Sequence, residues 1–257
     1  MVNDRLRSAM SSRQFTVEVF AAELGVDPKT VQRWLTHGRR PHRATAYRAA
    51  TLLDVPANWL WPELEARRGG AEPGEVVAFY PHRSETPKNL WLDLLKSADK
   101  ELWLLAYASL FLPEQNPEVI ALIKHKAANG VDVRIVLGDP DSPEAELRGR
   151  EEQLYDAIPA RIKMALAYYR PLTDVAGVKF HLHRTTLYNS IFRFDDQMLV
   201  NQHIYGAYGY IAPILHLRRV DSADLFETYT TSFERVWAES YPWRTPDSKV
   251  TTDRPAS

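Results

Sequence analysis

The stretch that decides the fold of the N-terminal part is FTVEVFAAELGVDPKTVQRWLTHGRRP, residues 15–41. Thr16 is suited to cap a first helix, and Gly25 stands where a left-handed residue would end it. Asp27 would cap a second helix, and Pro28 suits its first position, where a missing N–H loses no hydrogen bond. The stretch therefore predicts two short helices joined by a tight turn.

The apolar side chains of this stretch recur at helical spacing and predict an inner face for each helix. These positions are Val19, Phe20 and Leu24 in the first helix and Val31, Trp34 and Leu35 in the second. We interpret Trp34, Trp59 and Trp61 as core residues, because duplex DNA offers no exposed base faces for stacking. The outer face of the second helix is left with the polar residues Lys29, Thr30, Gln32 and Arg33.

These outward side chains have the chemistry that reads DNA. Lysine and arginine hydrogen-bond to guanine in the major groove, and glutamine hydrogen-bonds to adenine. Contacts to phosphate position a protein without reading sequence, and we expect them from Arg39, Arg40 and Arg43. Thr16 is also expected to be a DNA-binding residue. Residues 1–68 hold 11 Lys and Arg against 7 Asp and Glu, a net of +4, whereas residues 69–257 have a net of −5. The charge distribution therefore also places an anionic partner at the N-terminal part.

This segment resembles the Cro-type helix-turn-helix family, also called the xenobiotic-response-element (XRE) family, over about residues 3–64. The resemblance is carried by Ala21, the Gly25-Val26 turn, Val31, the Gly38 to Pro41 region and the ending LLDVPANWL. Val17 departs from the pattern, because the family often has a glutamine there that contacts the DNA backbone. The resemblance implies an all-α domain that binds a double-stranded DNA operator.

The composition of the 257 residues is that of a soluble globular protein, with 45% hydrophobic and 25% charged residues. There are no cysteines, which excludes disulfides, thiolate nucleophiles and cysteine zinc sites. Residues 1–14 lack the pattern of a secretory signal, and the longest apolar stretch, residues 102–112, is too short to span a membrane. We expect a cytoplasmic protein with no membrane partner.

Composition also predicts the domain boundaries. Residues 65–75, EARRGGAEPGE, contain three glycines, one proline and no large apolar side chain, and are predicted to be a linker. Residues 1–64 then form the DNA-binding domain and residues 76–243 a second domain. The polar residues 244–257 are predicted to be a disordered tail.

The second domain is predicted to be of the α/β class. Strands are expected near residues 75–80, 101–107, 131–137, 178–183, 189–194 and 197–201. Helices are expected over 116–129, over 143–170 with an interruption at Pro159, and over 222–240. Helices that alternate with strands indicate a parallel or mixed sheet covered by helices.

Residues 178–206, VKFHLHRTTLYNSIFRFDDQMLVNQHIYG, resemble the motif region of the phospholipase D superfamily, a family of α/β sandwich fold. That family has a His-x-Lys pair on a strand, followed by an Asp at a turn. Aligned on Asp195, the family's His falls on Tyr188 and its Lys on Ser190; aligned on Asp196, they fall on Asn189 and Ile191. The resemblance covers roughly residues 76–241 and implies an architecture whose catalytic pair is missing.

Without that pair we expect no catalytic residue, because the family's His is the nucleophile and its Lys stabilises phosphoryl charge. The former active site is then expected to bind a small polar ligand through Tyr188, Ser190, Asn201, His203 and Tyr205. Substitution of the nucleophile by His181, His183 or His203 is an alternative, as is the filling of a former active site by these side chains.

His181 and His183 lie two residues apart on a predicted strand, a spacing that can bind zinc. No third ligand follows from the spacing, and a polar strand face, exposed or lining a pocket, is the better explanation of the pair. We therefore expect no metal site and no cofactor.

The sequence as a whole predicts a DNA-binding transcriptional regulator that forms a homodimer through its C-terminal domain. Two-fold symmetry would match two operator half-sites, and single-motif phospholipase D-like chains generally pair. Two alternatives remain, namely a DNA-tethered phosphodiesterase or nuclease, and an antitoxin-like interaction protein.

Overall fold

The computed structural model describes residues 3–62, 74–221 and 223–243, and within them the side chains of Arg43 and Ala44 are not described. The predicted tail 244–257 and nearly all of the predicted linker 65–75 lie outside the described residues. Contacts separate the described chain into two compact units, one running to Glu75 and including 220–228, the other from Val76 to Arg219 and from Tyr229 onward. We call them the helical unit, described below through its residues 3–62, and the sheet unit. The helix over residues 225–239 spans the division and is described with the sheet unit, where Phe233 stacks on Trp103.

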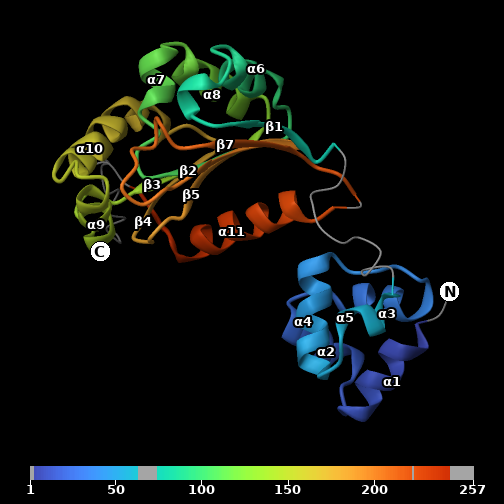
Figure 1. Ribbon diagram of the computed structural model, residues 1–257. Helices are drawn as coiled ribbons and strands as arrows, with labels where there is room; N and C mark the ends of the chain where they lie inside the picture. The colour runs from blue at the N-terminus through green and yellow to red at the C-terminus, as the bar shows by residue number, and fades with distance from the viewer. Residues whose placement is uncertain (1–2, 63–73, 222, 244–257) are drawn as a thin grey trace, which may run out of the picture. The chain divides into compact units, whose positions relative to one another are not determined.

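The helical unit contains five helices among its described residues (Figure 1): α1 (Asp4–Ser12), α2 (Val17–Leu24), α3 (Pro28–Thr36), α4 (Arg43–Leu53) and α5 (Ala57–Leu60). Its core is apolar, and Phe20, Val31 and Leu6 are fully buried there. Trp34 packs edge-on against Trp61 at a ring distance of 6.2 Å. The burial of these side chains holds α3 against the rest of the unit.

The turn between α2 and α3 has the local geometry that its residues predict. The Thr16 hydroxyl accepts a hydrogen bond from the backbone N–H of Val19 and caps α2. Gly25 ends that helix in the left-handed region at φ 66°. The Asp27 carboxylate accepts from the Lys29 backbone N–H at 2.7 Å, with Pro28 at the first position of α3. Both helix starts are thus stabilised by side chains next to them in the sequence.

Two predictions for the core of this unit are wrong. Val19 is 51% exposed and Trp59 is 41% exposed, although both were expected to point inward. The buried side of α2 is formed by Phe20, Ala21 and Leu24, and Val19 lies outside it. Trp59 lies on the surface, with the Arg5 guanidinium 5.9 Å from its ring.

The sheet unit contains one mixed sheet of eight strands in the order β1-β7-β6-β5-β2-β3-β4-β8. The strands are β1 (Val76–Tyr80), β2 (Glu101–Ala106), β3 (Asp132–Gly138), β4 (Val178–His183), β5 (Asn189–Phe194), β6 (Gln197–Gln202), β7 (Ile214–Arg218) and β8 (Tyr241–Pro242). Strands β2, β3 and β4 are parallel, and all other neighbours are antiparallel.

Helices cover both faces of this sheet (Figure 1). One layer holds α6 (Leu90–Ser97), α7 (Phe111–Gln115), α8 (Val119–Ala128), α9 (Pro143–Glu151) and α10 (Ala157–Tyr169), and α11 (Leu225–Glu239) lies on the opposite face. Phe192 of β5 packs against Trp91 of α6 on the first face. Trp103 of β2 stacks on Phe233 of α11 on the other, at a ring distance of 4.9 Å. The arrangement is a mixed α/β fold with helices on both faces of the sheet, although Val77 and Phe79 of β1 are exposed.

The structure differs from the sequence prediction in several places. Strands β7 and β8 and helices α6 and α7 were not predicted. The interruption predicted at Pro159 lies before it instead, because α9 ends at Glu151 and Pro159 stands in the first turn of α10. Proline is tolerated in a first helical turn, since no intrahelical hydrogen bond is lost there. Separately, none of the described helices combines the length and apolar character that a membrane span needs.

Candidate functional site

The candidate site lies where the sheet changes from parallel to antiparallel pairing. Strand β2 pairs in parallel with β3 on one side and antiparallel with β5 on the other. The start of β5, at Ser190, therefore lies beside the carboxyl end of β2, at Ala106. Asn201, near the end of β6, is the direct partner of Ser190. Such switch points at carboxyl ends of strands commonly form ligand-binding crevices in α/β sheets.

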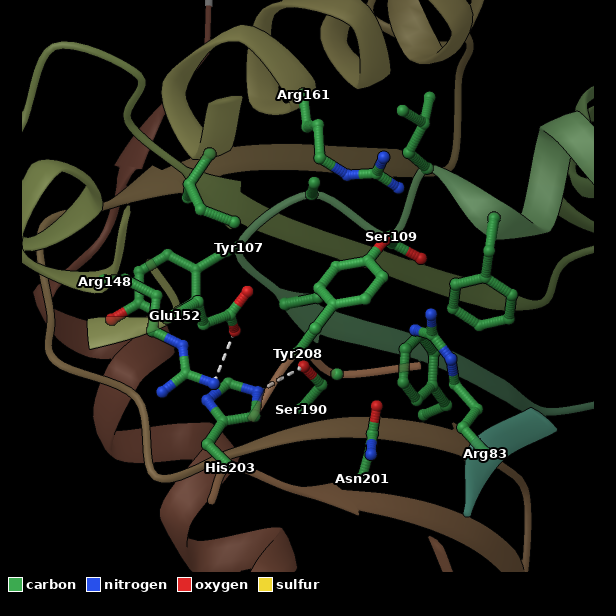
Figure 2. A pocket seen from close by; sticks show the side chains of 17 residues that line it. Arg83, Tyr107, Ser109, Arg148, Glu152, Arg161, Ser190, Asn201, His203 and Tyr208 are labelled. Carbon is green, nitrogen blue, oxygen red and sulfur yellow. Dashed lines mark hydrogen bonds and ion pairs between the residues drawn. The ribbon is translucent and has the colours of Figure 1, made fainter. Parts of the chain in front are cut away.

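A cavity opens at this point on the sheet face covered by α6 to α10 (Figure 2). Its volume is about 80 Å³, counted as the space open to the centre of a water-sized molecule. The polar groups that line it come from five parts of the chain: Arg83, Tyr107, Ser109, Arg148, Glu152, Arg161, Ser190, Asn201, His203 and Tyr208. The apolar lining includes Phe111 and Phe192.

Three arginines surround this cavity, with one carboxylate among the lining residues. Arg148, which is only 5% exposed, pairs with Glu152 at 2.5 Å and also contacts Glu151 at 3.4 Å. Arg83 and Arg161 form no ion pair with any carboxylate in the described ranges 3–62, 74–221 and 223–243. The Arg83 guanidinium stacks over Phe111 at 4.2 Å and that of Arg161 over Tyr208 at 5.4 Å. Burial and the neighbouring Arg161 lower the pKa of Arg83, although Tyr208 opposes the shift.

Ser190 and His203 form a hydrogen-bonded pair on the cavity wall. The His203 Nδ1 lies 3.0 Å from the Leu187 carbonyl oxygen, so this nitrogen carries the proton. Nε2 is then an acceptor, and the Ser190 hydroxyl donates to it at 3.0 Å. Burial and the positive charge of Arg148 lower the pKa of His203 to about 4, which keeps the ring neutral near pH 7.

Asn201 is fixed by two backbone carbonyls. Its Nδ2 lies 3.1 Å from the Pro213 oxygen and 3.5 Å from the Ala212 oxygen, which assigns the amide nitrogen to that side. The Oδ1 atom consequently points toward the cavity (Figure 2). Asn201 is 2% exposed, so its orientation is set by the protein and not by solvent.

The structure brings together three of the five residues for which the sequence predicts ligand binding. Ser190, Asn201 and His203 line the cavity. Tyr188 is 81% exposed and lines a second cavity, on the side of α11, with Arg235. Tyr205 is 82% exposed and lines neither cavity. The expectation that one pocket holds all five residues is therefore wrong for the two tyrosines. Tyr188 precedes β5 and Tyr205 follows β6, so both lie outside the two strands of the hairpin.

Sequence reasoning missed the charged part of this site. Arg83 precedes α6, Arg148 lies on α9 and Arg161 lies on α10. The only local signal was the spacing of Arg148 and Glu152, which places the two side chains on one side of a helix. Nothing in the sequence relates Arg83 to Arg161, which lie 78 positions apart. The pocket is therefore more basic than the neutral, hydrogen-bonding site that the sequence predicts.

The two histidines of β4 lie outside this cavity. His181 stacks on Trp237 at a ring distance of 4.0 Å and hydrogen-bonds to the Ser240 hydroxyl. His183 is buried, with Nε2 3.3 Å from the Ala106 carbonyl oxygen and Nδ1 accepting from the Thr185 N–H. Among the described residues, no group of three or more His, Asp or Glu side chains is placed to hold a metal ion.

The side chains for which DNA contacts are predicted lie on the surface of the helical unit. Lys29, Gln32, Arg33, Arg39 and Arg40 are exposed, Thr30 is half-buried, and Thr16 is exposed at the start of α2. Arg43 begins α4, but its side chain lies outside the described part of the chain. The exposed members present donors from the first two turns of α3 and from the loop after it.

No protein-family model and no curated protein matches the chain. Solved structures similar to it include Nuc from Salmonella typhimurium, a phospholipase D family member, at 14% identity and a TM-score of 0.42, covering 65% of this chain and 96% of Nuc. TrmBL2, an archaeal chromatin protein, has 12% identity and a TM-score of 0.43, covering 84% of this chain and 68% of its own. Phosphatidylserine synthase of Haemophilus influenzae has 14% identity and a TM-score of 0.42, and the match covers 70% of this chain and 42% of the synthase.

The cavity offers guanidinium donors and fixed acceptor atoms, and it lacks both a metal cluster among the described residues and a His-x-Lys pair. Such a site can bind and orient a small polar molecule.

Proposed function

We propose that this chain is a sequence-specific DNA-binding transcriptional regulator. In this proposal residues 1–64 form a helix-turn-helix domain of XRE type, joined by a linker, residues 65–75, to a phospholipase D-like domain, residues 76–243. The second domain forms a homodimer and senses a small ligand. The protein acts on double-stranded DNA in the cytoplasm.

The observation that carries this proposal is the outer face of α3. Lys29, Gln32 and Arg33 are exposed there, whereas Val31 and Trp34 are buried in the core. Their burial and the Asp27 cap hold the helix rigidly, so the exposed donors keep a fixed spacing. A recognition helix needs this combination to reach base edges in the major groove.

The flanking side chains support the same orientation. Thr16, Arg39 and Arg40 are exposed on either side of α3, where phosphate contacts are made by proteins that insert a helix into the groove. The described residues 3–62 hold nine Lys and Arg against five Asp and Glu, so the unit attracts a polyanion.

A selection of genomic fragments bound by the purified full chain, at one fixed salt concentration, tests the proposal. Enrichment of a short inverted repeat is the expected outcome, because a two-fold dimer reads two half-sites. Binding that depends on salt but favours no sequence would contradict sequence-specific regulation, since it reports phosphate contacts alone.

A DNA-tethered phosphodiesterase is the second candidate, and the Ser190–His203 pair is the observation that favours it. A serine hydroxyl bonded to a neutral imidazole is the arrangement of an activated nucleophile. The regulator proposal predicts no hydrolysis of bis-nitrophenyl phosphate by the full chain. Turnover that disappears in both Ser190→Ala and His203→Gln would favour the enzyme instead.

A further inference from the structure

The cavity at the β2–β5 switch point is lined by two chemically different sets of polar groups, and one of them calls for an anion. Arg83 and Arg161 have no carboxylate partner in the described part of the chain, and stacking on Phe111 and Tyr208 occupies only the faces of their guanidinium groups. The N–H donors of Arg161, and those of Arg83 that Tyr208 does not engage, are available to a carboxylate or phosphate oxygen. A half-buried cluster of this kind is stabilised by an anion that reduces the repulsion between its members.

The pair of Arg148 and Glu152 leaves further hydrogen-bonding capacity beside the cavity. Within the described residues, Arg148 Nε and Glu152 Oε2 are buried and have no hydrogen-bond partner. Buried polar atoms in native proteins are nearly always paired, and those left over mark the place of a ligand or an ordered water. Both side chains line this cavity, which gives a second and independent indication that it is a binding site.

The opposite side of the cavity presents acceptors. The Ser190 hydroxyl gives its proton to His203, so its oxygen offers only lone pairs to the cavity. The Asn201 amide nitrogen is engaged by Pro213 and Ala212, so its oxygen also faces the cavity as an acceptor. These two acceptors lie next to each other on paired strands. A hydroxyl group of a ligand can donate its proton to one of them, whereas an anionic oxygen can donate to neither.

We propose that this cavity binds a small anion that carries at least one hydroxyl group, with the charged end at Arg83, Arg148 and Arg161 and the hydroxyl at Ser190 and Asn201. The charged end is a carboxylate or a phosphate, which present the same oxygen geometry to guanidinium groups. The volume of 80 Å³ has room for roughly five to eight water-sized groups, which matches a hydroxy acid or a phosphorylated short polyol.

Titration calorimetry on the full chain, in phosphate-free buffer, tests this with two matched pairs of probes. L-Malate and succinate differ by one hydroxyl group, as do glycerol phosphate and propyl phosphate. Within the pair that binds, we expect the hydroxylated member to bind about five- to tenfold more tightly, as one neutral hydrogen bond provides. Binding of malate and succinate would indicate a carboxylate ligand, and binding of glycerol phosphate and propyl phosphate would indicate a phosphate ligand.

Three variants assign the two ends of the ligand. Arg161→Gln should weaken binding of every probe by about tenfold or more, because it removes a charge-assisted contact. Lys163→Gln is the matched control, since Lys163 lies on the same helix, is exposed and pairs with Asp141 outside the cavity. Ser190→Ala should remove the discrimination within a pair and leave the binding of succinate or propyl phosphate unchanged.

Absence of binding by all four probes would overturn the proposal, and so would equal affinities within both pairs. An equal loss in Lys163→Gln and Arg161→Gln would show a diffuse charge effect and overturn the assigned site. The role of the ligand as an effector rests on the proposed regulatory function, whereas its binding does not. A chain that reads DNA without binding an anion contradicts only this inference, and one that binds the anion without reading DNA contradicts only the regulator.

Discussion

Two buried histidines show how residue-scale environments shape the sheet unit. Burial lowers the pKa of His183 to about 4. Its hydrogen bonds to the Ala106 carbonyl and the Thr185 N–H act in the opposite direction but are outweighed. Burial and Arg148 lower the pKa of His203 to the same value, and the nearby Arg83 acts in the same direction. Both rings are therefore neutral in the folded protein over a pH range in which unfolded histidine is charged.

Acid should destabilise the sheet unit between pH 6.5 and about 4, the unfolded and folded pKa values of these two residues. In this window the unfolded state binds more protons, so the free energy of unfolding falls as the pH falls. Each histidine contributes up to about 3 kcal/mol to the change. Urea unfolding across this pH range measures the change in the free energy of unfolding. His203→Gln should reduce the dependence of this free energy on pH, whereas His125→Gln, at an exposed site on α8, should not.

Arg33 is the residue whose loss best tests base recognition. If its exposed side chain makes a bidentate base contact, Arg33→Ala should weaken specific operator binding by about 1–3 kcal/mol and relax the preference at one position. Fluorescence anisotropy with specific and scrambled duplexes measures both effects. Arg7→Ala, on the exposed face of α1, is the matched charge control and should change the affinities for the specific and the scrambled duplex equally. Wild-type operator affinity in Arg33→Ala would contradict the assignment of Arg33 as a base contact.

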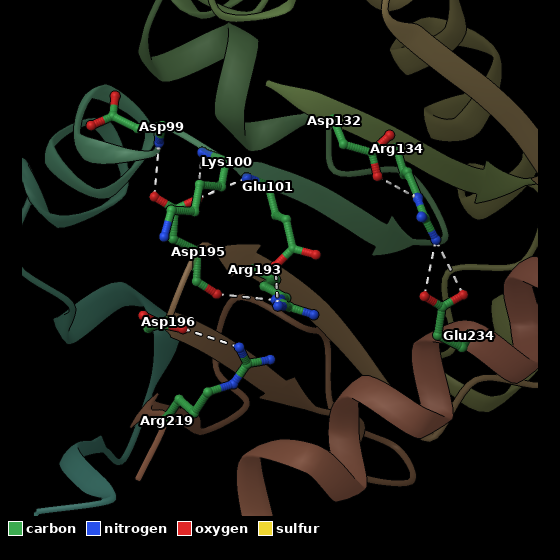
Figure 3. A network of polar contacts seen from close by, with 10 residues as sticks. All are labelled: Asp99, Lys100, Glu101, Asp132, Arg134, Arg193, Asp195, Asp196, Arg219 and Glu234. Carbon is green, nitrogen blue, oxygen red and sulfur yellow. Dashed lines mark hydrogen bonds and ion pairs between the residues drawn. The ribbon is translucent and has the colours of Figure 1, made fainter. Parts of the chain in front are cut away.

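At the scale of elements, the β5–β6 hairpin is joined to the start of β2 through one carboxylate (Figure 3). Asp195 stands at the hairpin turn with φ 52°, and its carboxylate accepts from the backbone N–H groups of Asp99, Lys100 and Glu101 at 2.7–2.8 Å. Burial alone would raise its pKa, but these three hydrogen bonds lower it. Asp195 is thus a structural residue in this chain.

Asp195→Asn should destabilise the sheet unit by about 1–3 kcal/mol, because an amide group replaces one acceptor oxygen and faces the backbone donors. Asparagine also tolerates the left-handed backbone, so the change isolates the hydrogen bonds. Asp196→Asn is the control, since Asp196 is exposed and contacts only Arg219 at 3.2 Å among the contacts shown in Figure 3. Chemical denaturation measures the free energy of unfolding of both variants. An equal loss of stability in the two would argue against the role of Asp195.

At the scale of the whole molecule, the sheet unit exposes large aromatic side chains near the β5–β6 hairpin. Tyr188 and Tyr205 are 81% and 82% exposed, and the Tyr188 carbonyl oxygen accepts from the His203 N–H at 2.9 Å, which places both ends of the hairpin together. Exposed aromatic side chains are enriched at protein interfaces. We therefore expect the homodimer contact at Tyr188 and Tyr205.

The full chain should sediment as a species of twice its mass of 29.5 kDa. The double variant Tyr188→Ser with Tyr205→Ser should shift it toward the monomer, because it removes apolar area from the interface. Tyr155→Ser, at a 65% exposed position between α9 and α10, should leave the dimer intact. Analytical ultracentrifugation over a dilution series measures the equilibrium, and a monomer at every concentration would contradict the homodimer.

The sequence by itself determined what depends on neighbours along the chain. Thr16, Gly25, Asp27 and Pro28 act within a few residues of themselves, so their caps and turn could be predicted. The same holds for the strands around Ser190 and Asn201, whose alternation and hairpin turn are local patterns.

Only the tertiary structure decided which distant residues share one cavity. Arg83, Arg148 and Arg161 come from separate elements, and packing of the helical layer on the sheet brings them to the side chains of Ser190 and His203. Packing likewise turned Tyr188 and Tyr205 outward and exposed Val19 and Trp59. The physical reason is that burial and electrostatic contacts act between groups close in space, whereas caps, turns and periodicity act between groups close in sequence.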